Sequence, residues 1–274
     1  MQVKELRYWL QPKETIFADF DSFVLDSGDH SRNRIFIDRG SLVLLVAHID
    51  TVIEPKFIKS RKTKSGKLKR VYARGLDDRL GCMIAYKLSN DLNVDLLICD
   101  NEERCASTGQ FHELKEYNWI AEFDREGDDV VTYELDSDAF RKALLEYWEI
   151  GFGSFSDIAQ LQTTACCMNV GIGVHLSHSI DSYACIKTMN RQIGKFKKFY
   201  KQHKDTPFVR DYKQSYYDID QVDYEYYLKE HYGECDLCGM ITTIQHVYDS
   251  KICQDCFESL IAQYCYGAWD KYEG

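Results

Sequence analysis

The sequence predicts an α/β fold with a largely parallel or mixed sheet over residues 1–204, followed by a small C-terminal module. Short apolar runs alternate with segments of helical periodicity, which is the order of elements in α/β proteins. Some runs, such as 94–99, are wholly apolar, as expected of strands that are buried on both faces. Two C-x-x-C pairs near the C-terminus predict the separate module.

Length and charge limit the classes of protein to consider. The 274 residues suit one domain with an appendage, or two small domains. A formal net charge of −10 argues against nucleic-acid binding, which usually requires a basic domain. No apolar stretch is long enough to span a bilayer, and the first residues lack the pattern of a signal peptide. We therefore expect a cytoplasmic protein that contacts neither membrane nor nucleic acid.

The 11 cysteines are unevenly placed along the chain. Scattered cysteines inside apolar segments are typical of reduced, buried side chains, and closely spaced pairs are typical of a metal site. The scattered ones are Cys82, Cys99, Cys105, Cys166, Cys167 and Cys185.

The first elements are one helix and two strands. Apolar positions at roughly helical spacing indicate a helix over 13–26. Strands over 34–38 and 41–48 are joined by Arg39-Gly40, which favours a hairpin-like turn.

Residues 53–73 are strongly basic and predict a β-hairpin centred on Ser65-Gly66. Charged side chains commonly protect an exposed edge strand, and this is the simpler interpretation. The alternative is a rim that attracts acidic ligands toward a nearby site.

From Gly75 onward, strands and helices alternate. A helix to about Asn90 begins with Asp77 and Asp78, where carboxylates suit the positive end of the helix dipole. Strand 94–99 ends in an acidic segment, at the position where open α/β sheets place their sites. The further predictions are helix 107–115, strands 119–123 and 129–133, helix 137–147, a glycine-rich loop at 151–157, strand 166–173, helix 180–203, and a tyrosine-rich, acidic connecting segment at 205–231.

The strand over 41–48 ends in His48, and Asp50 follows two positions later. In a strand, this spacing places both side chains on one face. A carboxylate there can accept the N–H of a metal-bound imidazole and thereby fix its orientation. A histidine that ends a core strand beside a solvated aspartate is the alternative interpretation.

Later strand ends and loops supply the other ligands that a metal site needs. Two histidines with several carboxylates form a donor set suited to zinc, with manganese or cobalt as alternatives. A pair of metals requires a shared carboxylate, and an unligated carboxylate must act as general base. Glu102 and Glu103 are expected to divide these roles, because neighbours on an extended segment point to different sides. The candidates are His48, Asp77, Glu102, Glu103, Asp124 and His178.

Five ordered motifs carry a resemblance to a known family. They are VAHIDTV, GLDDRLG, ICDNEER, AEFDREGDDVV and GVHLSHS, within about residues 30–204. The ordered set resembles the di-zinc aminopeptidases of the zinc-exopeptidase superfamily, which have the phosphorylase/hydrolase-like fold, a mixed sheet between helices. The resemblance implies two catalytic zinc ions and a peptide substrate. The intervals between the motifs are too short for the lid or dimerisation domain that several relatives insert.

The resemblance also assigns roles by position. His48 and Asp124 would hold one zinc ion, and Glu103 and His178 the other. Asp77 would bridge both ions, Glu102 would be the general base, and Asp50 would orient His48 as part of the catalytic machinery. Asp157 matches a supporting acidic residue of the second shell. His175 competes with His178, but the family pattern places a small hydroxyl residue after the ligand, which fits His178-Ser179 better.

The C-terminal module, residues 232–274, contains two cysteine pairs separated by fourteen residues. This spacing allows four thiolates to hold one structural zinc ion. The β-prone segment between the pairs predicts a hairpin and residues 257–272 a helix, an arrangement that resembles a treble-clef or zinc-ribbon finger. Its acidic and aromatic surroundings favour a protein partner over DNA. The four ligands are Cys235, Cys238, Cys253 and Cys256.

Together these features predict a metal-dependent hydrolase of amide bonds, most similar to an aminopeptidase that activates water between two zinc ions. Glu102 would take the proton of the attacking water and pass it to the leaving amine. The substrate would be a peptide or, for an N-acyl amino acid deacylase, an acylated amino acid. A catalytically inactive zinc-binding adaptor is the alternative from another class.

Overall fold

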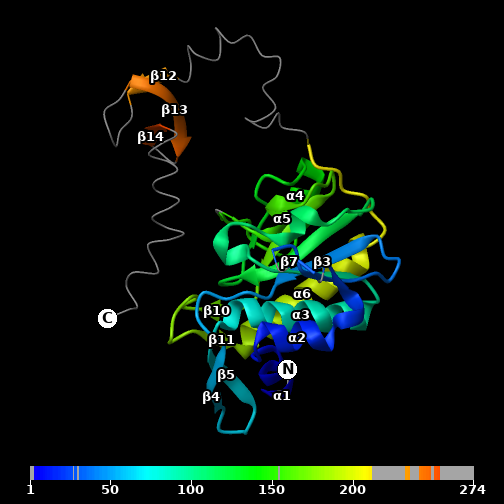
Figure 1. Ribbon diagram of the computed structural model, residues 1–274, viewed down its shortest axis with the longest axis vertical. Coiled ribbons are helices and arrows are strands. Elements are labelled where there is room, and N and C mark those ends of the chain that lie inside the picture. Colours follow the sequence, from blue (N-terminus) through cyan, green and yellow to red (C-terminus); the bar gives the residue numbers. More distant parts are fainter. Residues whose placement is uncertain are drawn as a thin grey trace. The chain divides into compact units, whose positions relative to one another are not determined.

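The computed structural model describes residues 3–26, 28–29, 31–153, 155–211, 232–234, 241–247 and 250–253, the last three ranges as backbone only. The chain divides into two compact units, Met1–Asp211 and Tyr212–Gly274. The first unit contains every described side chain, and Figure 1 shows its layers of helices and strands.

A seven-stranded sheet forms the centre of the first unit, in the order β1-β2-β6-β3-β7-β9-β8. The four middle strands are parallel to one another, and β1, β2 and β8 run antiparallel to their neighbours. This confirms the predicted mixed α/β fold. The strands are β1 Val24–Leu25, β2 Arg34–Ile37, β3 Val43–His48, β6 Asp95–Cys99, β7 Trp119–Arg125, β8 Val130–Val131 and β9 Cys166–Gly171.

Both faces of this sheet are buried, and alternate residues of β3 show how. Leu45 and Ala47 belong to one hydrophobic cluster, and Leu44 and Val46 belong to the other. Because successive side chains of a strand point to opposite faces, every residue of β3 is buried. The first cluster includes residues of α1 Val3–Trp9, α3 Leu76–Leu92, α4 Asp138–Leu145 and α6 Ile186–His203, and the second includes a residue of α5 Asp157–Gln160.

Helix α3 packs unusually close to the sheet, because Gly81 faces β7. A Cβ atom on Gly81 would lie 1.9 Å from the carbonyl oxygen of Phe123. The helix starts after Gly75, whose φ of +54° suits glycine, so that its first turn lies near the carboxyl ends of the parallel strands. Asp77 and Asp78 occupy this first turn.

Two cations attach the N-terminal segment to the rest of the unit. The guanidinium of Arg79, which is 2% exposed, donates to the carbonyls of Trp9 and Gln11 at 3.0 Å each. Lys13, in α2 Lys13–Asp19, donates to the carboxylate of Asp100 at 2.7 and 2.8 Å. The segment therefore contacts both α3 and the loop that follows β6.

A second, four-stranded sheet has the order β10-β11-β5-β4. Its β4 Lys56–Lys62 and β5 Leu68–Arg74 pair as the predicted basic hairpin. The two further strands, β11 Tyr183–Cys185 and β10 Val174–His175, flank the loop that carries His178. This sheet is joined to the site at two points, through β5 into α3 and through the β10–β11 loop.

The predicted helix over 13–26 is wrong in its second half. Helix α2 ends at Asp19, and a short 3-10 turn, Asp21–Phe23, leads into β1. Val24 pairs with Ile35 of β2, so the pairing of strands overrides the local helical spacing.

The hairpin predicted for 34–38 and 41–48 is also wrong, because β6 lies between the two strands. The Asp95 side chain of β6 accepts the backbone N–H groups of Arg39 and Ser41, at 2.8 and 3.0 Å. A turn pattern at Arg39-Gly40 does not reveal that a later strand, β6, lies between the two strands that the turn connects.

Two predicted helices are shorter in the structure. Only Thr108–Phe111 of the region 107–115 is helical, as a 3-10 turn. Helix α6 begins at Ile186 rather than 180, because residues 183–185 form β11.

In the second unit, β12 Tyr232–Glu234, β13 Ile241–Val247 and β14 Ser250–Cys253 form an antiparallel sheet. The hairpin predicted between the cysteine pairs corresponds to β13 and β14. Cys235, Cys238, Cys256, the predicted helix 257–272 and residues 212–231 lie outside the described residues, and Cys253 is described by its backbone alone. Among the helices that the structure describes, none has the length and apolar character to cross a membrane.

Candidate metal centre

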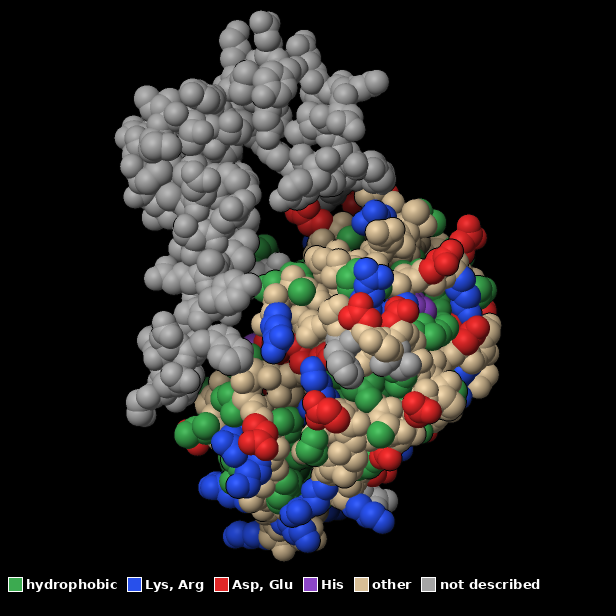
Figure 2. All heavy atoms as spheres, in the orientation of Figure 1, with side chains coloured by type: hydrophobic (Ala, Val, Ile, Leu, Met, Phe, Trp, Pro, Cys, Tyr) green, Lys and Arg blue, Asp and Glu red, His purple; other side chains and the backbone are tan. Residues whose placement is uncertain are grey.

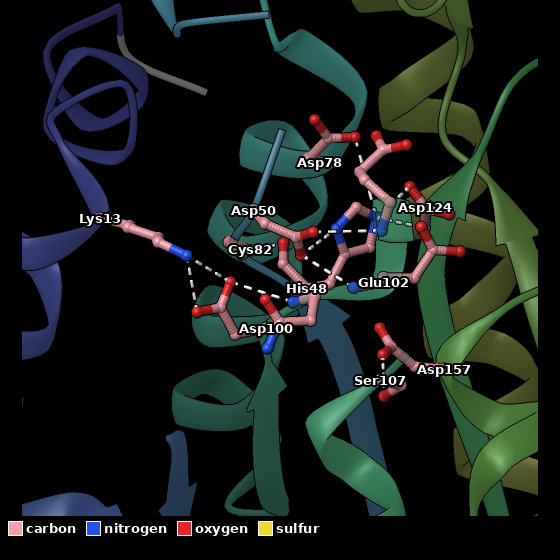
Figure 3. A network of polar contacts seen from close by, with 12 residues as sticks. Lys13, His48, Asp50, Asp78, Cys82, Asp100, Glu102, Ser107, Asp124 and Asp157 are labelled. Atoms are coloured by element: carbon pink, nitrogen blue, oxygen red, sulfur yellow. Dashed lines mark hydrogen bonds and ion pairs between the residues drawn. The ribbon is translucent and has the colours of Figure 1, made fainter. Parts of the chain in front are cut away.

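The candidate site lies where three neighbouring parallel strands end. His48 is the last residue of β3, Glu102 and Glu103 follow β6, and Asp124 lies near the end of β7. Helix α3 and the loop after β10 add two aspartates and His178. Figure 3 shows the side chains of Asp50, Asp78, Glu102 and Asp124, which come from separate elements, around His48.

His48 is buried among carboxylates. Its Nε2 atom lies 3.1 Å from Oδ1 of Asp124 and 3.8 Å from carboxylate oxygens of both Asp78 and Glu102. Burial by itself lowers the pKa of His48. The negative charges of Asp124 and Glu102, together with hydrogen bonds to Asp124 and Asp50, outweigh it and raise the pKa well above its usual value. Burial raises the pKa of Asp124, but the charge and hydrogen bond of His48, with the charge of His178, outweigh it and lower the pKa of that carboxyl.

Asp50 connects His48 to the acidic turn. Its Oδ1 atom lies 3.3 Å from Nδ1 of His48, and its two oxygens accept the backbone N–H groups of Glu102 and Glu103 at 3.1 Å each. Burial raises the pKa of Asp50, but the hydrogen bond and charge of His48, together with the N–H groups of Glu102 and Glu103, outweigh it and lower the pKa. Asp50 therefore fixes the imidazole and the turn together.

The segment with the two glutamates is not extended, as the sequence suggested, but forms a 3-10 turn, Glu102–Arg104. Asn101 precedes the turn with a φ of +66°, a conformation that asparagine tolerates better than most residues. Both carboxylates still reach the site, Glu102 beside His48 and Glu103 beside His178.

His178 lies at the opposite side of the cluster. Its Nε2 atom is 3.1 Å from Oε1 of Glu103 and 3.5 Å from Oδ2 of Asp77. The hydrogen bond with Glu103 raises the pKa of His178 to about 9. His175 instead stacks on the ring of Tyr183, with centroids 5.0 Å apart. Between the two histidines, His178 is the one whose imidazole contacts the candidate carboxylates.

Asp78 is a candidate ligand that sequence reasoning missed. It is 1% exposed, and both its carboxylate oxygens are buried without a hydrogen-bond partner among the described residues. Burial and the neighbouring Asp77 charge raise its pKa well above the usual value. The adjacent pair Asp77-Asp78 at a helix start was the available signal, since one capping aspartate would suffice.

The cluster fits divalent metal ions. Three groups of side chains place one potential ligand atom each within 4.8 Å of the others. Burial raises the pKa of Asp77 and raises that of Glu102 well above its usual value, because it outweighs the opposing charges of His178 and His48. Nitrogen and carboxylate donors of this kind suit zinc, manganese or cobalt. The groups are His48–Glu102–Asp124, His48–Asp78–Glu103 and Asp77–Asp78–His178.

Asp157 and Glu122 lie in a buried polar network behind the site. Asp157 accepts a hydrogen bond from Ser107, and burial raises its pKa to about 6. Glu122, which is fully buried in β7, accepts a hydrogen bond from Ser156. Asn169 of β9 accepts the backbone N–H of Asp124 at 3.1 Å, so the network meets the site there. Sequence reasoning found Asp157 but missed Glu122, although a charged residue two positions before Asp124 in an apolar strand was a signal.

The comparisons with known proteins concern the fold alone. No protein-family model matches the chain, and a search of curated proteins found no match. Among solved structures, the chain is similar to a tripeptidase from Staphylococcus aureus subsp. aureus Mu50, with a TM-score of 0.49, 10% identity and coverage of 74% of this chain and 97% of that chain.

Two further solved structures are similar to the chain. For the TET1 peptidase of Pyrococcus horikoshii, the TM-score is 0.47 and the identity 12%, covering 71% of this chain and 97% of that one. For the aminopeptidase PepT of Bacillus cereus, the TM-score is 0.41 and the identity 8%, with coverage of 72% of this chain and 96% of that one. These three solved structures with a similar fold are peptidases.

Proposed function

We propose that the chain is a metal-dependent hydrolase of amide bonds, and specifically an aminopeptidase-like exopeptidase with a two-metal site. One observation carries this proposal. Two histidines from distant segments each lie 3.1 Å from a carboxylate. The buried Asp78 belongs to a candidate ligand group with each histidine, and its neighbour Asp77 belongs to the group with His178. This is the donor arrangement that two neighbouring metal ions require.

His48 and Asp124 would hold one ion, and Glu103 and His178 the other. Asp77 is the proposed bridging carboxylate, and Asp78 is close enough to both groups to share that position. When bound, the two divalent ions, zinc by our proposal, would polarise the substrate carbonyl and make the attacking water more acidic.

Glu102 is the proposed general base. Its side chain is 12% exposed and lies 3.8 Å from the imidazole of His48, so it borders the ligands while remaining accessible to a water molecule. Glu102 would accept the proton of the attacking water and donate it to the leaving amine. Asp50 would act on this step indirectly, because it holds the N–H groups at the start of the turn.

The test is hydrolysis of a panel of amino-acyl amides by the zinc-loaded protein and its Glu102→Gln variant. We expect the variant to lose about 10²- to 10⁴-fold in kcat, the usual contribution of a general base, while its metal content stays unchanged. Glu113→Gln is the matched control, because Glu113 is an exposed glutamate outside the cluster. Equal activity of Glu102→Gln and the wild type would disprove the mechanism.

The same panel separates the alternatives when it includes N-acyl amino acids. Hydrolysis of those compounds alone would identify a deacylase. A protein that hydrolyses nothing and binds about one zinc ion per chain would be the binding or adaptor protein.

A further inference from the structure

The outer face of the small sheet carries four side chains in a row, one from each strand. Lys59 of β4 is paired with Tyr72 of β5, which is paired with Tyr183 of β11, which is paired with His175 of β10. The Lys59 Nζ atom lies 5.1 Å from the centre of the Tyr72 ring, and the two tyrosine rings are 5.5 Å apart. We call these four residues the cross-strand row.

Two arginines lie beside the cross-strand row. Arg61 and Arg70 are directly paired between β4 and β5. The Arg61 guanidinium lies 5.4 Å from the centre of the Tyr72 ring, and that of Arg70 lies 4.7 Å from the centre of the Tyr183 ring. A hydrogen bond from Arg70 lowers the pKa of the Tyr72 hydroxyl.

The charges of Lys59, Arg61 and Arg70 are not neutralised by carboxylates of the described residues. Elsewhere in the described part of the chain, Lys13 and Lys115 form ion pairs with carboxylates within 4.0 Å. Lys59, Arg61 and Arg70 instead contact aromatic rings. Figure 2 shows lysine and arginine side chains gathered at the lower end of the view, over the β4–β5 hairpin. A locally positive face on a chain of net charge −10 attracts anionic ligands.

Protection of an edge strand does not explain this arrangement. β4 is at the edge of the sheet, but Arg70 and Tyr72 belong to β5, and Tyr183 belongs to β11, both of which are paired on both sides. The cations also lie over the tyrosine rings and cover the ring faces. The N–H groups of the cations are therefore what a ligand can bind. This favours carboxylates over nucleic-acid bases, which would need free rings for stacking.

The cross-strand row is close to the metal centre along two chain segments. His175 is three residues before His178, and Tyr72 is five residues before Asp77. Since a chain spans at most about 3.6 Å per residue, these pairs of Cα atoms lie within roughly 11 and 18 Å. An extended peptide covers these distances with three to five residues.

We propose that the cross-strand row, with Arg61 and Arg70, binds acidic side chains of a peptide substrate three to five residues beyond the cleaved bond. This inference rests on the proposed function, because the peptide must be held at the metal centre. It specifies the substrate class as peptides with aspartate or glutamate after the first residues.

The test compares two heptapeptides that differ only in positions 4–6, glutamate in one and glutamine in the other. With the zinc-loaded full-length chain at low ionic strength, we expect about 10-fold higher kcat/KM for the acidic peptide, mainly through a lower KM. The Arg61→Gln/Arg70→Gln variant should reduce this ratio to about one. Lys64→Gln/Lys67→Gln removes the same charge from the exposed hairpin turn and should keep the ratio. A ratio that changes equally in both variants would overturn the proposal.

A binding measurement separates failure of this inference from failure of the proposed function. Equal cleavage of both peptides by the wild type would overturn the acidic-peptide site and leave the hydrolase proposal intact. Cleavage of neither peptide would overturn both assignments of a substrate. In parallel, dye-labelled acidic peptide and dye-labelled oligo-dT are titrated against the same proteins. Tighter binding of the oligonucleotide, lost in Arg61→Gln/Arg70→Gln, would assign the face to nucleic acid instead.

Discussion

Asp50 joins the strand that carries His48 to the turn that carries the two glutamates. One carboxylate contacts the imidazole and also accepts two consecutive backbone N–H groups. The orientation of a metal-binding histidine and the position of the general base therefore depend on the same side chain. A change at Asp50 should affect metal affinity and catalysis together.

We expect Asp50→Asn to weaken zinc affinity by roughly 10- to 100-fold, the usual effect of losing a carboxylate that supports a metal-binding histidine. The number of ions bound at saturation should not change, because Asp50 is not a proposed ligand. Calorimetric titration of the metal-free protein with zinc measures both quantities. Asp205→Asn, at a position whose side chain is 83% exposed, is the control. Unchanged zinc affinity would show that Asp50 does not support His48.

The sequence located most of the cluster but not its full composition. His48, Asp124 and His178 were recognisable because each ends or follows an apolar strand and carries a motif. Asp78 is expected at the helix start beside Asp77, where capping explains only one of the two aspartates, but the sequence does not show that both its oxygens are buried. Glu122 was overlooked because its partner Ser156 is 34 residues away. Burial and long-range partners depend on tertiary structure, which local patterns do not contain.

His112 should make the free energy of unfolding depend on pH. Burial, followed by the nearby charge of Arg34, lowers its pKa from 6.5 to about 4. Between these values the unfolded chain binds more protons than the folded one, so the stability is complete above pH 6.5 and is lost as the pH falls toward 4. The shift corresponds to roughly 3 kcal/mol.

His112→Phe tests this expectation, because His112 already packs against Phe36, with ring centroids 4.3 Å apart. Urea unfolding of both proteins at several pH values gives the two stability curves. The wild type should lose stability relative to the variant as the pH falls from 6.5 to 4. Parallel curves would contradict the assigned pKa.

At the scale of elements, the contact between α3 and β7 holds two parts of the candidate site together. Helix α3 carries Asp77 and Asp78, and β7 carries Asp124. Because a Cβ atom at Gly81 would lie 1.9 Å from the Phe123 carbonyl, Gly81→Ala must push these elements apart. We expect a loss of about 1–3 kcal/mol or more in the free energy of unfolding, together with weaker zinc binding.

Gly194→Ala is the matched control, since Gly194 is an exposed residue within α6 and no atom lies within 4 Å of its added Cβ. This variant should gain about 0.5–1 kcal/mol from the higher helix propensity of alanine. Thermal and urea unfolding measure both effects. A Gly81→Ala protein as stable as the wild type would show that the contact is not tight.

The elements themselves were predictable to different degrees. The strongly periodic α3 and the wholly apolar β6 follow from local sequence, and so does the β4–β5 hairpin with its central Ser65-Gly66. The partners of β2 did not follow, since the chain makes a turn at Arg39-Gly40 and yet β6 is inserted beside it. Strand order depends on which long-range pairing buries most apolar surface, and a local turn pattern does not predict that pairing.

At the scale of the whole molecule, metal content distinguishes the two predicted metal sites. We propose two ions in the cluster at the strand ends and one held by Cys235, Cys238, Cys253 and Cys256. The zinc-loaded protein should therefore contain about three zinc ions per chain by elemental analysis. Cys235→Ser/Cys238→Ser should contain about two and retain amide hydrolysis. A wild type with one zinc ion, lost in this variant, would contradict the two-metal site.

The attachment of the N-terminal segment has a consequence for the order of folding. Trp9 accepts its hydrogen bond from Arg79, 70 residues later, and Lys13 pairs with Asp100, 87 residues later. During synthesis, residues 3–13 leave the ribosome long before either partner exists, so this segment cannot dock when it is made. Asp100 lies two residues before Glu102, so the ion pair between Lys13 and Asp100 links this segment to the acidic turn. Residues 3–13 can therefore take their place only after α3 and the loop that follows β6 have been made.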